Sequence, residues 1–351
     1  MGLNMDSIDV LDPSRESSGP NPGSFSRSLV RMLVYITLTL AMIPVQYIAI
    51  RRGSSLQRSL PRWYHRQCCK ILGFRVERRG RQSRMHPTLF VSNHSSYIDI
   101  MVLGSLLPVS FVAKSEVASW PFFGWLAKLQ RSVFVERRRH KSGNGRDEMS
   151  LRLEAGDDLV LFPEGTSNDG NRVLPFKSAL FAAANTELDG HPITVQPVSI
   201  AYTRLDGVPM GRYLRPFFAW YGDMLLASHI WRAVGLGWVT VVVDFHPPVT
   251  LADFSSRKAL SDHCHRQVSL GVAAALSGRP RRQIERLVAA RQTARLTDAR
   301  SLEERTAAGA MPAQAGPDPV AGAKAEPGAE SADAPGPGSP KPGSPGSVSS
   351  E

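Results

Sequence analysis

A histidine and an aspartate stand five positions apart at the end of an apolar run in this chain of 351 residues. His94 and Asp99 belong to the segment NHSSYID, which directly follows the strand-like run PTLFVS. On one continuous helix this spacing would place the two side chains about 140° apart, so a pair requires His94 in a loop and Asp99 in the following helical turn. A carboxylate on one ring nitrogen leaves the other free to accept a proton, as a general base requires. Taken alone, the spacing fits a structural histidine–aspartate pair equally well.

Two further segments have side chains suited to an anionic or polyol ligand. The segment LFPEGTS, residues 161–167, ends a strand in a turn where Gly165 permits close backbone approach and Thr166 can donate its hydroxyl. The segment SVFVER, residues 132–137, ends in Arg137, whose planar guanidinium suits a phosphate. By itself, this arginine could equally pair with a nearby glutamate on a solvated face.

The elements that must position these residues follow an alternating pattern. Six apolar runs are typical of strands, several of them apolar on both faces: 87–92, 108–114, 132–137, 157–164, 193–202 and 238–245. Helical patterns separate them near residues 98–107, 119–129, 145–155 and 176–185. We therefore predict an α/β fold with a mixed, largely buried sheet flanked by helices. Pro197 predicts an edge or bulged position for its strand.

The remaining segments divide the chain by composition. The two ends contain little that could form a core, and residues 307–351 are rich in Pro, Gly, Ala and Ser. We predict disordered segments at both ends and four ordered regions between them. The predicted boundaries are a disordered segment 1–26, a membrane-anchoring helix 27–50, a basic amphipathic lead-in 51–85, a catalytic domain 86–250, a helical extension 251–306 and a disordered tail 307–351.

The predicted anchor includes nineteen residues without a charge, from 32 to 50. This length is close to that of a membrane span, although Pro44 and Gln46 also fit a helix that only enters the bilayer. Between residues 51 and 84 the sequence has ten arginines and one lysine but a single acidic residue, Glu77. No zinc-ligand pattern or nucleic-acid motif accompanies this block, so we expect an anionic lipid surface and no nucleic acid as partner. Its position after the anchor predicts an inner-membrane protein with its catalytic domain on the cytoplasmic side.

Two other patterns bear on partners. The aromatic segment WPFFGW, residues 120–125, fits either the membrane interface or a packed core helix. The segment HCH, residues 263–265, cannot direct its side chains to one ion from a single short helix. We therefore expect neither a metal nor a cofactor, and the three cysteines of the chain fit reduced thiols.

Four motifs, taken in order, resemble those of the glycerolipid acyltransferase family, which includes the bacterial 1-acylglycerol-3-phosphate acyltransferases. The resemblance extends from about Trp63 to Phe245. The matching residues are Asn93, His94 and Asp99 in the first motif, Phe134 and Arg137 in the second, Phe162, Pro163, Glu164, Gly165 and Thr166 in the third, and Pro197 in the fourth. Ser167 stands where many members carry an arginine, for which Arg131, Arg172 and Lys177 are candidate substitutes.

The resemblance implies transfer of a fatty acyl group from acyl carrier protein or coenzyme A to the free hydroxyl of lysophosphatidic acid, giving phosphatidic acid. His94 would be the general base and Asp99 its orienting partner. Arg137, with Phe134, would hold the phosphate, and residues 162–166 would bind the head group. Glu164 would face glycerol hydroxyls or an arginine.

Alternatives remain open for the acceptor and for the class of protein. The acceptor could be lyso-ornithine lipid or another lysophospholipid, and the chain could be a catalytically silent membrane scaffold. A serine hydrolase is disfavoured because the sequence contains no G-x-S-x-G segment.

Overall fold

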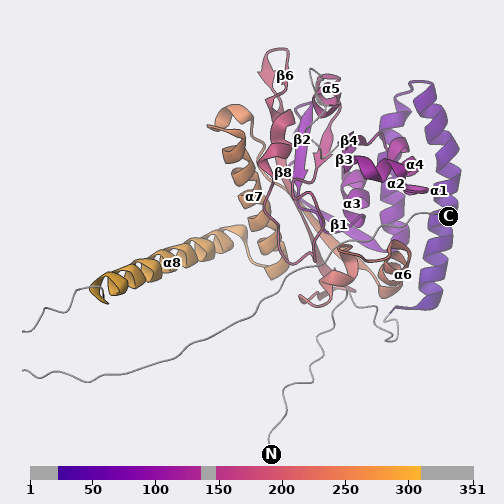
Figure 1. Ribbon diagram of the computed structural model, residues 1–351. Helices are drawn as coiled ribbons and strands as arrows, with labels where there is room; N and C mark the ends of the chain where they lie inside the picture. Colours follow the sequence, from indigo (N-terminus) through magenta and orange to yellow (C-terminus); the bar gives the residue numbers. More distant parts are fainter. Residues whose placement is uncertain (1–22, 136–147, 310–351) are drawn as a thin grey trace, which may run out of the picture. The chain divides into compact units, whose positions relative to one another are not determined.

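The protein is described by a computed structural model that covers residues 23–135 and 148–309. It divides into two units at residue 293. The larger unit contains the sheet and the helices that pack on it (Figure 1). The described part of the smaller unit is the continuation of helix α8 (Arg281–Gly309), which extends past the predicted boundary at residue 306. The rest of the predicted tail, and most of the predicted N-terminal segment, lie outside the described residues.

A mixed sheet forms the centre of the larger unit. Its strands lie in the order β1-β10-β8-β2-β5-β3-β4, and β9 pairs with β8. The pairs that β8 makes with β10 and β9 are antiparallel, and the other pairs of this sheet are parallel. The bounds are β1 Phe74–Gly80, β2 Thr88–Ser92, β3 Ser110–Lys114, β4 Val133–Val135, β5 Leu159–Leu161, β8 Thr194–Leu205, β9 Val208–Pro209 and β10 Val239–Phe245. A separate short hairpin joins β6 (Glu187–Leu188) to β7 (His191–Pro192).

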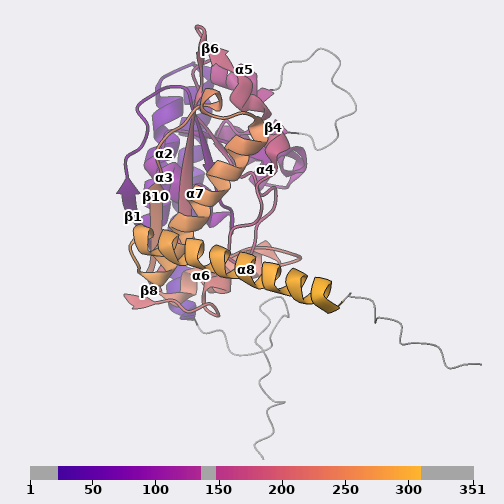
Figure 2. The ribbon, with the colours of Figure 1, turned by 90° about the vertical axis from the view of Figure 1, so that its left-hand side faces the viewer.

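Helices cover both faces of this sheet, which explains why its strands are apolar on both sides. Along β2, Phe90 packs into one core with α2 and α3, whereas Leu89 and Val91 pack into a second core with α7. Figure 2 shows α7 lying across the sheet, on the face opposite to α2 and α3 in Figure 1. The helices are α1 Phe25–Arg51, α2 Leu56–Leu72, α3 Ile98–Leu106, α4 Phe123–Leu129, α5 Glu148–Glu154, α6 Leu226–Leu236 and α7 Arg257–Ser277, with 3-10 turns at Ser115–Ser119 (η2), Ser178–Asn185 (η3), Arg215–Phe218 (η4) and Leu251–Asp253 (η5).

All six predicted strands are present, with two differences from the sequence interpretation. The sheet also contains β1, which lies within the segment predicted as a basic lead-in. Its charged side chains are exposed along an edge, where charge discourages further strand pairing. Pro197 predicted an edge or bulged position, and the edge is wrong because β8 lies between β10 and β2. The register shift between β8 and β10 lies at Thr240 and Val241, away from the proline. The proline is accommodated because the β10 ladder begins at Val198, and the Pro197 carbonyl accepts the N–H of His246 at 3.0 Å.

Helix α1 buries polar side chains and exposes apolar ones. Arg31 donates to the carbonyls of Val234 and Gly237 at 2.7 and 2.9 Å, and Gln46 donates to that of Leu129 at 2.9 Å. Its exposed apolar side chains are Phe25, Leu29, Val30, Leu33, Val34, Ile36, Leu40, Val45, Tyr47 and Ile48. Among the described helices, α1 is the one long and apolar enough to cross a membrane.

The aromatic segment at residues 120–125 is also exposed. Trp120, Phe122, Phe123 and Trp125 keep 40–49% of their surface accessible. This exposure excludes the interpretation as a packed core helix.

Candidate active site

The first and third motifs lie at the same edge of the sheet. His94 follows β2, and residues 162–166 follow β5. Because β2 and β5 pair in parallel, both loops leave the sheet at the carboxyl ends of their strands. This is the edge where open α/β sheets place their binding sites.

His94 and Asp99 form the hydrogen-bonded pair that their spacing predicts. The His94 Nδ1 atom lies 3.0 Å from Asp99 Oδ2, with His94 in the loop and Asp99 in the first turn of α3. The same carboxylate oxygen accepts the backbone N–H groups of Ser95 and Ser96 at 2.7 and 2.9 Å. Asp99 is fully buried, whereas the His94 side chain is 22% exposed. The geometry assigns Nδ1 to the carboxylate and leaves Nε2 as the nitrogen that can take a proton.

Phe162 packs against one face of the His94 ring. The two rings are stacked with centroids 4.1 Å apart and planes inclined by 20°, and Phe111 stacks in turn on Phe162 at 6.4 Å. The imidazole is therefore held at one edge by Asp99 and on one face by an aromatic ring.

Glu164 holds the backbone of the histidine loop. Its side chain is buried and accepts the N–H of His94 at 3.0 Å, the Asn168 amide at 2.7 Å and the N–H of Leu174 at 3.2 Å. The Asn168 amide also donates to the His94 carbonyl at 3.2 Å. Burial raises the pKa of Glu164 to about 7, although these three hydrogen bonds act in the opposite direction. Both backbone polar groups of His94 are thus held, the N–H by Glu164 of the third motif and the carbonyl by Asn168, which follows that motif.

The turn after Glu164 places a cation beside the backbone. Gly165 has φ +69°, and Lys177 Nζ lies 2.7 Å from where a Cβ would stand, so both the conformation and the space favour glycine. Thr166 is exposed and donates a long hydrogen bond, 3.5 Å, to the Ser167 carbonyl. The Ser167 hydroxyl donates to the Trp220 carbonyl at 2.5 Å, which ties this turn to the segment before α6. Pro163 is buried directly before the turn.

The second motif is only partly described. Phe134 lies in β4, paired with Ala113 of β3, and is half-buried. Arg137 lies outside the described residues. Arg131 does not substitute for the missing family arginine. It lies before the start of β4, away from the site, and its guanidinium donates to Asp157 at 2.8 Å. Arg172 is exposed in the loop that follows the third motif.

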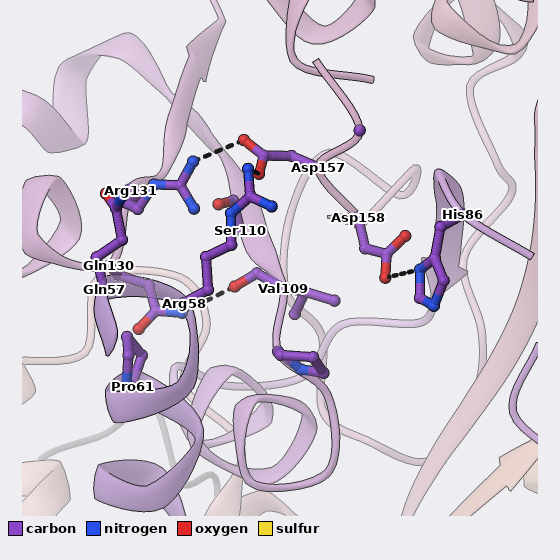
Figure 3. Close-up of a pocket in the computed structure, with 12 residues that line it drawn as sticks. Gln57, Arg58, Pro61, His86, Val109, Ser110, Gln130, Arg131, Asp157 and Asp158 are labelled. Atoms are coloured by element: carbon purple, nitrogen blue, oxygen red, sulfur yellow. Dashed lines mark hydrogen bonds and ion pairs between the residues drawn. The ribbon is translucent and has the colours of Figure 1, made fainter. Parts of the chain in front are cut away.

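A cavity of about 360 Å³ lies at the opposite edge of the sheet, where the strands begin (Figure 3). Asp157 accepts guanidinium hydrogen bonds or ion pairs from Arg58, Arg131 and Arg152 at 3.2, 2.8 and 2.7 Å. Asp158 contacts His86 at 2.8 Å. These contacts join α2, α5 and the starts of β4 and β5, so we assign the cluster to the stability of the fold.

Sequence reasoning missed two residues of the site. Asn168 follows the third motif directly and could have been considered as a polar neighbour of the turn. Tyr202 donates its hydroxyl to Asp99 Oδ1 at 2.6 Å from strand β8. No spacing in the sequence connects Tyr202 to Asp99, because the contact depends on which strands are neighbours.

Comparisons with known proteins agree with the motifs. A family model described as Acyltransferase matches residues 73–201. The chain is 46% identical over 248 residues to a lyso-ornithine lipid O-acyltransferase of Brucella abortus, covering 70% of this chain and 93% of that protein. It is 41% identical over 253 residues to the protein of that name from Rhizobium meliloti, covering 71% and 87%. A 1-acyl-sn-glycerol-3-phosphate acyltransferase of Neisseria gonorrhoeae is 32% identical over 197 residues, covering 55% and 73%.

A solved structure shares the fold. The crystal structure of the 1-acyl-sn-glycerophosphate acyltransferase PlsC from Thermotoga maritima matches with a TM-score of 0.51 at 22% identity. The match covers 71% of this chain and 95% of that one.

Proposed function

The chain belongs to the acyltransferase family and acts on lysolipids, and we propose that its acceptor is lyso-ornithine lipid. The observation that carries this proposal is the 46% identity that extends over 93% of a lyso-ornithine lipid O-acyltransferase. The relative named for lysophosphatidic acid chemistry is 32% identical over 73% of its length. This difference reverses the order of the two acceptors expected from the motifs.

Two of the cations expected from the family pattern are absent from this site, which fits the same acceptor, although Lys177 lies beside the turn at Gly165. Ser167 replaces a family arginine, and its hydroxyl is bound to the Trp220 carbonyl. Arg131 is bound to Asp157 at the other edge of the sheet. Both observations reduce the positive charge available to a phosphomonoester, which carries nearly two negative charges at neutral pH. A zwitterionic head group needs less compensation.

We propose that His94 and Asp99 carry the chemistry. His94 Nε2 removes the proton of the acceptor hydroxyl while that oxygen attacks the thioester carbonyl carbon. Asp99 stabilises the imidazolium that forms. The carbon–sulfur bond then breaks, and the departing thiol takes the proton from His94. The donor is the thioester of acyl carrier protein or coenzyme A, and Arg137, Phe134 and the turn at 162–166 are proposed to bind the acceptor.

We also propose that α1 and the aromatic segment at 120–125 lie in the cytoplasmic face of the inner membrane. The exposed face of α1 is apolar, while its buried face is hydrogen-bonded to Gly237, which follows α6, and to Leu129, the last residue of α4. Because α1 is attached to the domain near both of its ends, a helix that crossed the bilayer would place part of the domain inside the bilayer. Labelling of Ser26→Cys and Arg52→Cys in sealed vesicles tests this, because both residues are exposed and a helix lying in one leaflet leaves both positions accessible from the same side.

The acceptor proposal is tested by direct competition. The purified protein is offered lyso-ornithine lipid and lysophosphatidic acid at equal concentration, with labelled acyl-carrier-protein and acyl-coenzyme A donors in separate reactions. We expect label mainly in ornithine lipid. Label mainly in phosphatidic acid would overturn the acceptor but leave the acyl-transfer chemistry in place. The His94→Ala variant, prepared identically, gives the background.

A further inference from the structure

Tyr202 contacts the catalytic aspartate on the oxygen that His94 does not use. Its hydroxyl donates to Asp99 Oδ1 at 2.6 Å, whereas Oδ2 receives the imidazole of His94 at 3.0 Å. A second contact to Oδ1, from the Ser95 hydroxyl, is 3.4 Å long. Tyr202 is therefore the strong donor to this oxygen among the contacts described.

The Tyr202 hydroxyl stays protonated, and its ring is held in position by packing. Burial, followed by the charge of Asp99, raises the pKa of Tyr202 well above its ordinary value, so the group remains a donor at any working pH. Its ring is stacked on Phe218, with centroids 6.3 Å apart and planes inclined by 7°. Phe218 is fully buried, so the tyrosine has little freedom to follow a displaced carboxylate.

The same strand also holds the other end of the histidine loop. Asn93 accepts the N–H of Ile200 at 2.9 Å and donates to its carbonyl at 3.0 Å. Ile200 and Tyr202 stand two positions apart in β8, on one face of the sheet. Strand β8 therefore fixes the loop before His94 through Asn93 and the helix after it through Asp99.

From this geometry we propose that Tyr202 is a positioning residue for acyl transfer, which orients Asp99 toward His94 and moderates the negative charge that His94 experiences. The inference rests on the proposed role of His94 as general base. Without the hydroxyl, Asp99 can rotate, and its charge is shared with one donor fewer. We expect the protonated imidazole to be stabilised relative to the neutral ring, and the His94–Asp99 hydrogen bond to form in its productive geometry less often.

Other titratable groups face this cluster and must be distinguished from Tyr202. Cys69 of α2 and Tyr97 of the histidine loop face the hydroxyl, and burial raises the pKa of both, that of Cys69 to about 12. Glu164 faces His94 from the β5 side, with a pKa of about 7. Glu164 is present in both the wild-type protein and a Tyr202 variant. The difference between the pH profiles of the two proteins therefore reports on the Tyr202 hydroxyl.

The test compares Tyr202→Phe with Tyr97→Phe. The control also loses a buried hydroxyl, bonded to His229 at 3.0 Å, but not a contact to Asp99. Two readouts are used: kcat and KM across pH, and NMR titration of the labelled His94 ring, assigned with His94→Ala. For Tyr202→Phe we expect kcat to fall about tenfold with KM within about twofold. We also expect the acid limb and the ring titration to move to higher pH, and both to stay unchanged in Tyr97→Phe.

Each outcome has a separate meaning. A ring titration identical to wild type would overturn the inference, even if activity falls, because packing alone explains that result. If the wild-type protein transfers no acyl group but the ring titration moves, the proposed function fails and the positioning contact stands. Should Tyr202→Phe not fold, 3,5-difluorotyrosine at position 202 strengthens the donor at nearly the same size. The acid limb of kcat is then expected to move to lower pH, and a move to higher pH would overturn the inference.

Discussion

Two histidine–aspartate pairs lie at opposite edges of one sheet in the part of the chain that the structure describes. His94 and Asp99 lie 3.0 Å apart where the strands end, and His86 and Asp158 lie 2.8 Å apart where they begin. The shorter distance belongs to the pair to which we assign no chemistry. Distance alone therefore does not identify a general base.

The two pairs differ in how their members are held. Asp99 is fully buried and receives two backbone N–H groups, while its histidine is stacked on Phe162 and remains 22% exposed. His86 is 58% exposed, and its partner Asp158 follows Asp157, which three arginines contact. A catalytic pair needs a fixed orientation with one nitrogen accessible, and only the first pair combines these properties.

Removing the base should give the largest effect. For His94→Ala we expect acyl transfer to fall by ~10²–10⁴-fold, the usual contribution of a general base. Initial rates at saturating acceptor, corrected for the amount of folded protein, provide the measurement. Retention of more than half the activity would remove the distinction between the two pairs.

Replacing the orienting carboxylate should be the next most severe change. Asp99→Asn keeps the size of the side chain but cannot balance an imidazolium, and its amide can stabilise the wrong tautomer of His94. We expect a loss of at least about tenfold in kcat. An activity close to wild type would show that His94 needs no charged partner.

Local and distant parts of this site differ in how well the sequence predicts them. The placement of His94 in a loop and Asp99 in a helical turn follows from five residues of spacing, and the structure shows it. Tyr202 is 103 positions from Asp99, and Glu164 is 70 positions from the His94 N–H that it accepts. Such contacts depend on strand order, which hydrophobic periodicity does not encode. Strand β1 was missed for a related reason, because an exposed edge strand lacks the apolar signal of a buried one.

Glu164 allows a sharper test of how the histidine loop is held. Its carboxylate accepts three N–H groups, and a glutamine would direct its own N–H₂ at one of these donors. For Glu164→Gln we expect kcat to fall about tenfold with little change in KM. A raised KM for the acceptor with kcat unchanged would favour the head-group contact that the family resemblance implies.

The same residue predicts a pH dependence of stability. The pKa of Glu164 in the folded protein, about 7, lies above its ordinary value of 4.5. Between these values the folded state binds more protons than the unfolded state, so this group's contribution to stability decreases as pH rises. Relative to Glu164→Gln, the wild-type protein should lose unfolding free energy between pH 5 and about pH 7. Thermal unfolding in detergent at both pH values measures this, and an unchanged difference would contradict the assigned pKa.

The arginine cluster at the other edge should affect stability more than catalysis. Asp157 is 6% exposed and faces three guanidinium groups, of which Arg58 is 54% exposed and contributes least. For Asp157→Asn we expect the unfolding free energy to fall by about 1–3 kcal/mol. Activity per folded molecule should stay within about twofold, and a larger loss would connect this edge to the reaction.

The smallest effect is expected for His86→Ala, the counterpart of His94→Ala. A contact made by an exposed side chain contributes about 0–1 kcal/mol, and Asp158 keeps the N–H of Thr88, which it accepts at 2.7 Å. Stability should therefore change little, and acyl transfer should remain within about twofold of wild type. Both variants delete an imidazole that is hydrogen-bonded through Nδ1 to a buried aspartate. The ratio of their activities therefore measures how much the position and orientation of His94 contribute beyond the presence of such a pair. If His86→Ala lowered kcat as far as His94→Ala, the cavity where the strands begin would have to take part in the reaction.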